Sequence, residues 1–203
     1  LIIGLGMIGS SIALASKSKG IKVYGFDKSN NSIKEALEKN IIDSQVESIL
    51  DINSKDFVKK VDLIIVAVPP KQTLDVLNDL KNIWNTDVTI TDTSSVKNHI
   101  KLNGASNIVL SHPIAGSDQS GISAANGDLF KNKKNVLCDP FKSKKGHFEK
   151  VDNFWKNALQ MRTSSMSVSE HDLIFAMTSH LPHLVSYALI DSIRLSPTKV
   201  GDN

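Results

Sequence analysis

A glycine-rich loop at the start of the chain constrains the fold more than any other feature. Gly4-Leu5-Gly6-Met7-Ile8-Gly9 directly follows the apolar run Leu1–Ile3 and directly opens an amphipathic stretch, so it joins a strand to a helix. In such a junction the first glycine permits a tight turn, the second lets the backbone approach a pyrophosphate, and the third lets helix and strand pack closely. In this context the pattern predicts a dinucleotide-binding βαβ unit.

The first two-thirds of the chain alternates short β-branched runs with amphipathic stretches, which is the pattern of a parallel sheet with crossover helices. We expect strands at residues 1–3, 22–26, 63–68, 88–91, 108–110 and 136–137, and helices at 8–17, 32–39 and 73–83. Thr73 is the expected N-cap of the last helix. Pro69-Pro70 ends the strand before it, because neither proline can donate to a ladder. This alternation predicts an α/β fold of the Rossmann type.

The pattern changes in the last third of the chain. A helix is expected over His147–Leu159, a last strand over Met161–Met166, and a long helix from Ser169 onward. We therefore place a nucleotide-binding domain at residues 1–166 and the beginning of an all-helical domain at residues 167–203. Both ends of the chain look cut, so we interpret it as a fragment.

The apolar stripe of the long helix is too wide for one neighbouring domain to cover. It comprises Leu173, Ile174, Met177, Leu181, Leu184, Val185, Ala188 and Leu189. A stripe of this width needs a second partner. Pro182 removes one helical hydrogen bond, so we expect a bend that aims His180 at a cleft. These features predict a homodimer with the site near its interface.

Bulk properties bear on the other possible partners. The formal net charge is +3 and the lysines are spread along the chain, so no basic stripe points to nucleic acid. We see no apolar run that approaches the length needed to span a membrane. Cys138 is the only cysteine, which excludes an internal disulfide and favours a reducing compartment. We expect a cytoplasmic protein in which Cys138 is an inert packing residue.

An acidic residue lies where a dinucleotide-binding unit needs one. The second expected strand ends at Asp27, about 20 residues after the loop. A carboxylate there accepts hydrogen bonds from ribose hydroxyls and repels a 2′-phosphate, which favours NAD over NADP, although Lys28 beside it weakens this preference slightly. The glycines alone could form a plain strand-to-helix turn. Strand, helix, spacing and acid together favour a nucleotide site.

Three clusters are expected past the carboxyl ends of strands, where such folds bind their ligands. They are Val66–Pro70, Thr91–Lys97 and Ser111–Ser117, and a fourth cluster, Ser179–His183, lies on the long helix. Val68 and Pro69 would lie against the cofactor. The second cluster brings hydroxyl groups, and the third brings His112 in a loop fixed by a proline and a glycine.

The combination of motifs resembles a known family. A G-L-G-x-I-G loop, D-x-x-S-V-K at 92–97, H-P-I-A-G-S at 112–117 and S-H-L-P-H at 179–183 occur in the order and spacing of prephenate and arogenate dehydrogenases. Many dehydrogenases share the first motif, whereas the last two together are specific, and the similarity runs over essentially the whole chain. The resemblance implies a Rossmann domain followed by a helical dimer-forming domain. It also implies NAD-dependent oxidative decarboxylation of prephenate or arogenate in tyrosine biosynthesis.

The resemblance assigns roles to individual residues. His112 matches the catalytic histidine, which hydrogen-bonds the ring hydroxyl of the substrate and withdraws its proton as a carbonyl develops. Ser95 matches the serine that bridges this hydroxyl, the histidine and the nicotinamide ribose. His180 matches a histidine that lines the pocket from the helical domain and would meet a substrate carboxylate. Ser117 and Asp118 would line the side-chain end of the substrate, where an acid would favour the ammonium of arogenate; the choice between the two substrates stays open.

Several of these residues have alternative interpretations. Ser95 also fits an N-cap of a helix through Val96–Ile100. His180 and His183 are three residues apart, but no cysteine or acid lies at the spacing of a zinc site, so no metal is expected. The other histidines are assigned to packing or an interface (His183), to a helix start or subunit contact (His171-Asp172, which also matches the family), and to the surface (His99 and His147).

One departure from the family concerns the ring carboxylate of the substrate. The family anchors it with an arginine well after the S-H-L-P-H motif, whereas this chain has only Arg162 and Arg194, neither in that context. A bidentate guanidinium–carboxylate pair is hard to replace. We expect the chain as given to bind NAD but to turn over poorly.

Two rival functions share the glycine loop. β-Hydroxyacid dehydrogenases have a similar domain arrangement but use a lysine of the helical domain as acid and base, and residues 169–193 contain no lysine. A non-catalytic NAD-binding module would keep the loop and Asp27 but would have no need for His112, Ser95 and His180.

Overall fold

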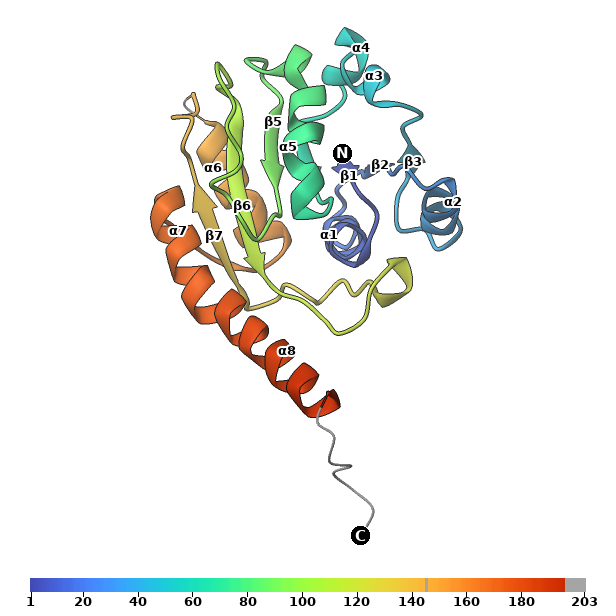
Figure 1. Ribbon diagram of the computed structural model, residues 1–203. Coiled ribbons are helices and arrows are strands. Elements are labelled where there is room, and N and C mark those ends of the chain that lie inside the picture. Colours follow the sequence, from blue (N-terminus) through green and yellow to red (C-terminus); the bar gives the residue numbers. More distant parts are fainter. Residues whose placement is uncertain (145, 196–203) are drawn as a thin grey trace.

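The computed structural model describes residues 1–144 and 146–195. Within these residues, eight strands form one sheet in the order β3-β2-β1-β4-β5-β6-β7-β8 (Figure 1). Neighbouring strands from β3 through to β6 are parallel, β6 and β7 are antiparallel, and β7 and β8 are again parallel. The first six strands therefore have the order 3-2-1-4-5-6 of a Rossmann fold, which confirms the predicted fold class.

Every expected strand is present, with shifted ends. The strands are β1 (Ile2–Ile3), β2 (Tyr24–Phe26), β3 (Ser44–Gln45), β4 (Leu63–Val66), β5 (Thr89–Asp92), β6 (Ile108–Ile114), β7 (Lys134–Cys138) and β8 (Arg162–Ser165). The strand β3 was not expected, because two residues are too few to show a period. The strand β6 continues well past its expected end and carries the segment around His112 within the sheet.

Helices connect and flank the strands. They are α1 (Met7–Lys17), α2 (Asn30–Glu38), α3 (Ile49–Ile52), α4 (Lys55–Val58), α5 (Pro70–Asp79), α6 (His147–Asn153), α7 (Val168–Phe175) and α8 (Leu181–Arg194). Shorter turns are η1 (Lys81–Ile83), η2 (Ile122–Ala124), and the π-helical η3 (Phe154–Ala158) and η4 (Ala176–His180).

The central strands supply two hydrophobic cores, one on each face of the sheet. Adjacent residues of a strand point to opposite faces, so Ile3 packs in the core that contains Leu77 of α5, and Ile2 packs in the core that contains Ile12 of α1. Trp155 of η3 is fully buried in that second core. Helices therefore cover both faces, as the near-continuous apolar strands require.

Two local predictions were wrong. Thr73 does not cap α5: the helix begins at Pro70 with Pro69 as N-cap, and the Thr73 hydroxyl bonds back to the Pro69 carbonyl at 3.4 Å. Proline suits the first helical position because its fixed φ is already helical and its missing N–H is not needed there. Nor does Ser95 cap a helix, since residues 96–100 contain only a turn at residues 98–99.

The last described segment is one long helical run from α7 through η4 to α8. Ser167 caps it with a capping box, in which the Ser167 hydroxyl accepts from the Glu170 N–H and the Glu170 carboxylate accepts from the Ser167 N–H. Before Pro182, where the sequence predicts a bend, the helix contains the π-helical turn η4, which ends at His180. The helical run continues through Pro182 into α8.

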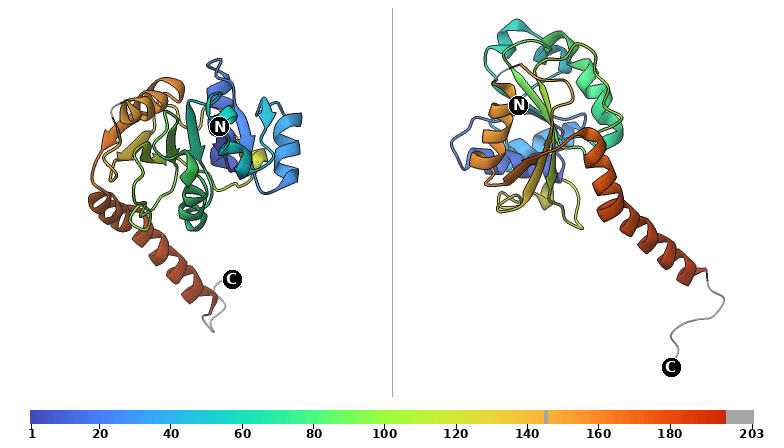
Figure 2. Two further views of the ribbon diagram at one scale, coloured as in Figure 1. Left: turned by 90° about the horizontal axis from the view of Figure 1, so that it is seen from above. Right: turned by 90° about the vertical axis from the view of Figure 1, so that its left-hand side faces the viewer.

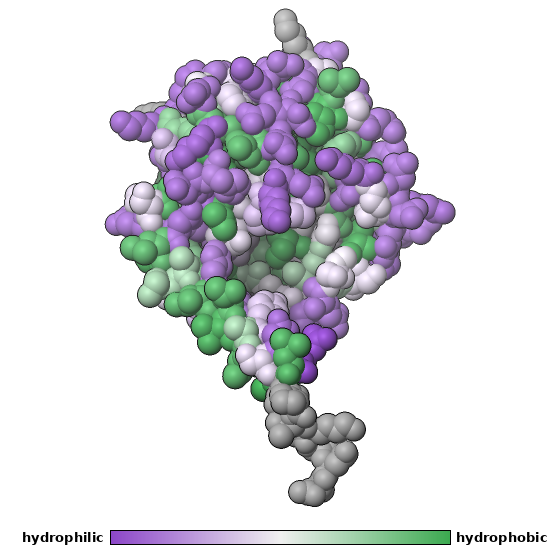
Figure 3. Space-filling view, viewed as in Figure 1, coloured by the Kyte–Doolittle hydropathy of each residue, from purple (hydrophilic) through white to green (hydrophobic). Residues whose placement is uncertain are grey.

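The helix α8 projects away from the rest of the molecule (Figures 1 and 2). Its large apolar residues are exposed, for example Leu184 at 65% and Leu189 at 62%, and hydrophobic side chains gather on this projection in Figure 3. By length and composition alone, Val168–Arg194 could cross a bilayer. The prediction that no apolar stretch approaches that length was wrong, because apolar residues predominate on average although serines, a threonine and histidines interrupt them.

Candidate active site

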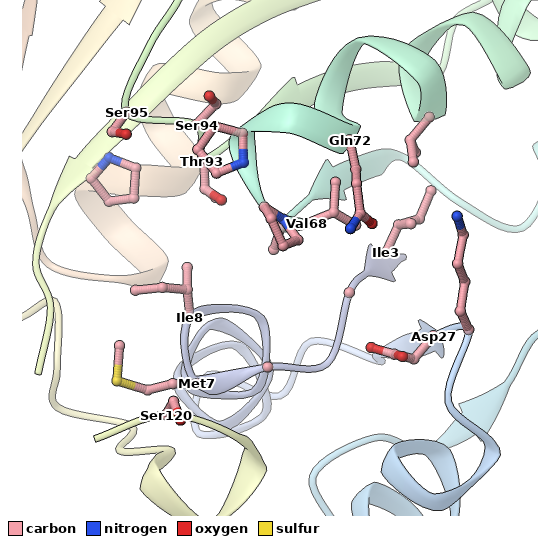
Figure 4. A pocket seen from close by; sticks show the side chains of 18 of the residues that line it. Ile3, Met7, Ile8, Asp27, Val68, Gln72, Thr93, Ser94, Ser95 and Ser120 are labelled. Atoms are coloured by element: carbon pink, nitrogen blue, oxygen red, sulfur yellow. The ribbon is translucent and has the colours of Figure 1, made fainter. Parts of the chain in front are cut away.

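A cavity of about 560 Å³ lies at the carboxyl ends of β1 and β4, where the strand order reverses. This switch point is where open α/β sheets bind their ligands. In Figure 4, Asp27 lies at one end of the pocket and Ser95 at the other, with Val68 and Ile8 between them. Figure 3 shows a hollow in this face of the molecule, above α8.

Each of the three glycines of the loop is required, or tolerated, for a different structural reason. Gly4 has a φ of +97°, and an added Cβ there would lie 2.7 Å from the Ala67 carbonyl oxygen. A Cβ on Gly9 would lie 1.9 Å from the Gly4 oxygen, so the helix could not pack against the loop. A Cβ on Gly6 would meet no atom within 4 Å. The turn and the packing therefore require Gly4 and Gly9, whereas Gly6 faces open space beside the cavity.

Asp27 ties the glycine loop to the end of β2. One oxygen of its carboxylate accepts from the Leu5 N–H at 2.7 Å and the other from the Ser29 N–H at 2.8 Å. Asp27, Lys28 and Met7 line the cavity, whereas Leu5 is buried beneath the loop. The acid therefore also has a structural role that the sequence did not indicate.

Asp92 and Lys97 form a second element of the site. Both side chains are fully buried, and the Lys97 ammonium donates to both carboxylate oxygens at 2.7 and 2.8 Å. The ammonium also donates to the Ser111 carbonyl, and Asp92 accepts from the N–H groups of Ser111 and Ser94. This ion pair fixes the loop that carries Ser95 against the strand that carries His112.

His112 lies at the cavity wall in contact with a second histidine. Its Nδ1 is 2.9 Å from Nε2 of His171, and Nδ1 of His171 is 2.7 Å from a carboxylate oxygen of Asp172. The ring of Phe175 packs against both imidazoles, with ring centres 4.7 Å apart in each pair. His171-Asp172 lies near the start of α7, as the helix-start interpretation predicted, but it also contacts His112 because α7 folds back onto the end of β6.

Burial is the main influence on the charge of His112. Desolvation, followed by the nearby positive charge of Lys97 and the influence of His171 and His180, lowers the pKa of His112 to about 3. The imidazole is therefore neutral at physiological pH, with one ring nitrogen free to accept a proton.

The structure brings together most of the predicted site residues. Gly4, Gly6, Met7, Ile8, Asp27, Val68, Pro69, Ser95 and His112 line the cavity. Ser117 and Asp118 do not: they are exposed and hydrogen-bonded to each other at 3.0 Å, and their neighbours Gln119 and Ser120 line the cavity instead. His180 is exposed on η4, outside the lining but near enough to lower the pKa of His112.

Two further histidine assignments can be compared with the structure. His147 is not a surface residue, since it is only 8% exposed and its Nδ1 lies 2.8 Å from the Thr89 hydroxyl. Here α6 covers the start of β5, a tertiary contact that its sequence period does not specify. His99 is partly exposed, as expected, and its Nε2 lies 3.1 Å from the Pro70 carbonyl oxygen. Among the described residues no group of three His, Cys, Asp or Glu side chains is arranged to hold a metal.

The sequence placed Asp92 and Lys97 in the cluster Thr91–Lys97 without predicting that they pair, and it did not place His171 and Asp172 in the site. A signal existed for the first two, because an acid and a lysine five residues apart directly after a buried strand cannot both stay unpaired. The match of His171-Asp172 to the family was a signal for His171, but its contact with His112 could not be predicted because it joins residues far apart in the sequence.

Family models match two parts of the chain. Residues 12–160 match the model described as "Prephenate dehydrogenase, nucleotide-binding domain", and residues 167–201 match "Prephenate dehydrogenase, dimerization domain". Among curated relatives, the prephenate dehydrogenase of Bacillus subtilis is 34% identical over 199 residues, covering 94% of this chain and 52% of the relative. The cyclohexadienyl dehydrogenase of Zymomonas mobilis is 32% identical, covering 95% of this chain and 66% of the relative.

Solved structures give the same relationship. A structure of prephenate dehydrogenase from A. aeolicus in complex with hydroxyphenyl propionate and NAD+ has a TM-score of 0.85 and 31% identity, over 97% of this chain and 69% of that chain. Synechocystis arogenate dehydrogenase has a TM-score of 0.80 and 25% identity over the same shares of both chains. The chain spans about half to two thirds of the length of the curated relatives it matches. It belongs to the prephenate dehydrogenase family.

Proposed function

We propose that the protein catalyses the NAD-dependent oxidative decarboxylation of prephenate or arogenate. The observation that carries this proposal is His112, a neutral imidazole at the wall of a cavity that also contains the glycine loop and Asp27. A general base beside a dinucleotide site suits the removal of a hydride from a carbon that bears a hydroxyl. Named relatives that act as prephenate, cyclohexadienyl and arogenate dehydrogenases support the same reaction.

The cavity fits a dinucleotide at the glycine loop. Gly6 leaves open space for a pyrophosphate, and the first turn of α1 has no side-chain cap among the described residues, so its N–H groups can bind phosphate oxygens. Asp27 would accept from the ribose hydroxyls with lone pairs that Leu5 and Ser29 do not use. Val68, Pro69 and Ser95 would hold the nicotinamide end. When bound there, NAD supplies the acceptor for the hydride that leaves ring C4.

The residues of the chain handle the proton and the orientation of the substrate. His112 accepts the proton of the ring hydroxyl as the carbonyl develops. The C1–carboxylate bond then breaks, carbon dioxide leaves, and the electrons of that bond make the ring aromatic. His112 returns the proton to the oxygen, which gives a phenol. Ser95 would orient the hydroxyl toward the base, and His180 would meet a substrate carboxylate.

The proposal includes the assembly and the place of action. We assign residues 1–166 to the nucleotide-binding domain and residues 167–203 to the beginning of the helical domain. Residue 145 of the first domain and residues 196–203 of the second lie outside the described part of the chain. The match of residues 167–201 to a dimerization domain supports a homodimer, which would cover the exposed apolar face of α8. A second subunit, rather than a membrane, would then cover the apolar side chains of Val168–Arg194. We propose a cytoplasmic enzyme, in accord with a single buried cysteine, Cys138.

The test is the formation of NADH by the full-length protein with prephenate, arogenate and a 3-hydroxy acid as separate substrates. Turnover with prephenate or arogenate, and none with the 3-hydroxy acid, is the expected result. Turnover with the 3-hydroxy acid alone would replace the proposal with the β-hydroxyacid dehydrogenase alternative. Binding of NAD without turnover of any of the three would favour a non-catalytic module.

A further inference from the structure

His112, His171 and Asp172 form a chain of three hydrogen-bonding groups that leads from the partly exposed Asp172 through the buried His171 to the cavity. The two contacts in the chain are 2.9 and 2.7 Å long. His171 is fully buried between its two neighbours, and Asp172 is reached from outside only in part. A buried imidazole whose two nitrogens hydrogen-bond one carboxylate and one second imidazole has few possible protonation patterns.

The carboxylate at one end sets the direction of this chain. Burial opposes ionisation of Asp172, but hydrogen bonds from His171 and from the N–H groups of Asn98 and Lys97 lower its pKa below the ordinary value. An ionised carboxylate can only accept hydrogen bonds. The Nδ1 atom of His171 must therefore carry a proton and donate it to Asp172.

The remaining protons follow from this donation. Burial lowers the pKa of His171, so the ring is neutral and holds one proton, at Nδ1. Its Nε2 then has a free lone pair and accepts from Nδ1 of His112. His112 is neutral as well, so its own single proton is at Nδ1. Its Nε2 is left with a lone pair.

We propose that His171 and Asp172 are positioning residues for His112: they hold it as the Nδ1–H tautomer, with the Nε2 lone pair free to act as the base. The inference deepens the proposed function and rests on it. With the opposite tautomer, Nε2 would carry a hydrogen and could not take the proton of a substrate hydroxyl. A wrong histidine tautomer is known to disable an otherwise intact catalytic site.

Asp172 also connects the hydrogen-bond chain of His112 and His171 to the loop that carries Ser95. Its carboxylate accepts from the N–H groups of Lys97 at 3.0 Å and Asn98 at 2.8 Å, directly after Ser95 and Val96. One carboxylate from α7 therefore fixes both the orientation of the base and the loop that carries the neighbouring hydroxyl. The start of the helical segment is in this way part of the site, although of the three residues His112, His171 and Asp172 only His112 lines the cavity.

The tautomer can be read directly, without any measurement of activity. In the full-length protein with 15N-labelled histidine, the 15N chemical shifts distinguish a protonated ring nitrogen from one with a lone pair. We expect the neutral His112 ring to have a protonated Nδ1 and an unprotonated Nε2. In His171→Leu, which removes the acceptor, the proton should move to Nε2 in a large share of molecules. In His171→Gln, whose amide oxygen can accept at a similar reach, the Nδ1–H form should persist.

Activity gives the second readout. His171→Leu should lower kcat about 10–100-fold, as expected when a group that orients a histidine is removed, with the Kd for NAD unchanged. His171→Gln should recover most of this loss. Glu170→Gln, a change of the neighbouring exposed acid in the capping box of α7, is the matched control and should leave the tautomer unchanged.

Two outcomes would overturn the inference: a wild-type His112 with its proton on Nε2, or a His171→Leu protein that is folded and keeps the Nδ1–H form. Because the tautomer is measured without substrate, the conclusion about the His112 tautomer would hold even if the protein did not catalyse the proposed reaction. A failed tautomer test would in turn leave the reaction untouched. Far-UV circular dichroism and thermal melting of each variant show whether it is folded, and Asp172→Ala, which removes the acceptor for Nδ1–H of His171, provides a second way to break the chain if His171→Leu does not fold.

Discussion

Lys97 and Asp92 are paired entirely inside the protein, with an ammonium-to-carboxylate distance of 2.7 Å and no exposed side-chain surface on either residue. Asp92 ends β5, and Lys97 lies beyond the loop that carries Thr93, Ser94 and Ser95, so the pair closes that loop over the edge of the sheet. Removing one partner of a buried ion pair leaves the other charge without compensation.

Lys97→Met should lower the free energy of unfolding by about 3–5 kcal/mol, the usual cost of leaving one charge of a buried pair alone. Urea denaturation measures this change. Lys101→Met, at an exposed lysine nearby, is the control and should change stability little. The double variant Asp92→Asn/Lys97→Met should be more stable than Lys97→Met. If Lys97→Met were as stable as the control, the pair would not be a structural element of the loop.

Asp27→Ser should weaken NAD binding and relatively improve NADP, because the repulsion of a 2′-phosphate disappears. The same change removes the acceptor of the Leu5 N–H, so binding of both cofactors should also weaken somewhat. Titration with NAD and NADP by intrinsic fluorescence or calorimetry gives the ratio of the two Kd values. Asp75→Ser, at an exposed acid of α5, should leave the ratio unchanged. An unchanged ratio in Asp27→Ser would remove Asp27 from cofactor selection.

His112→Asn in the full-length protein should lower kcat about 10²–10⁴-fold, which is the usual loss on removing a general base. The Kd for NAD should stay near that of the wild type, since the glycine loop and Asp27 are intact. His99→Asn is the control, because His99 lies outside the cavity lining on the loop after Lys97. Near-normal turnover in His112→Asn would exclude His112 as the base.

The free energy of unfolding should fall as the pH is lowered from about 7 to 5. Burial is the largest cause that lowers the pKa of His112, His147 and His171 in the folded protein. Below the unfolded pKa of about 6.5 the unfolded chain therefore binds more protons than the folded one, so the free energy of unfolding decreases as the pH decreases. Each histidine can contribute at most about 1.4 kcal/mol per pH unit.

His147 offers a way to check this without touching the cavity. His147→Gln removes one titrating group, so the loss of stability between pH 7 and 5 should be smaller in the variant than in the wild type. Urea unfolding at the two pH values measures both slopes. Equal slopes would mean that His147 titrates alike in the folded and unfolded states.

Leu189→Glu should convert the expected homodimer of the full-length protein into monomers at micromolar concentration. Leu189 is 62% exposed on α8, and a charge in an apolar interface is costly. Light scattering after gel filtration measures the mass. Asp191→Lys, about 200° around the helix from Leu189, should leave the dimer intact. A monomeric wild type with full activity would contradict the role of α8 as an interface.

The sequence alone determined the fold class and the nucleotide half of the site. Gly4, Gly6 and Gly9 specify a turn whose geometry is local, since it depends on φ angles and contacts within one βα junction. The strands were predictable because β-branched runs buried on both faces are nearly continuous in sequence. The position of Asp27 followed from the length of one βαβ unit. Each of these signals lies within about 30 residues.

Tertiary structure decided the chemical half of the site. Asp172 and His171 act through contacts with residues that no sequence period relates to them, up to 75 positions apart. Ser117 and Asp118 follow His112 closely in sequence, yet they are exposed outside the cavity lining, and Gln119 and Ser120 line the cavity instead. The protonation of a buried imidazole depends on which groups are brought together and shielded from water, and for His112 the packing of α7 against the end of β6 does both.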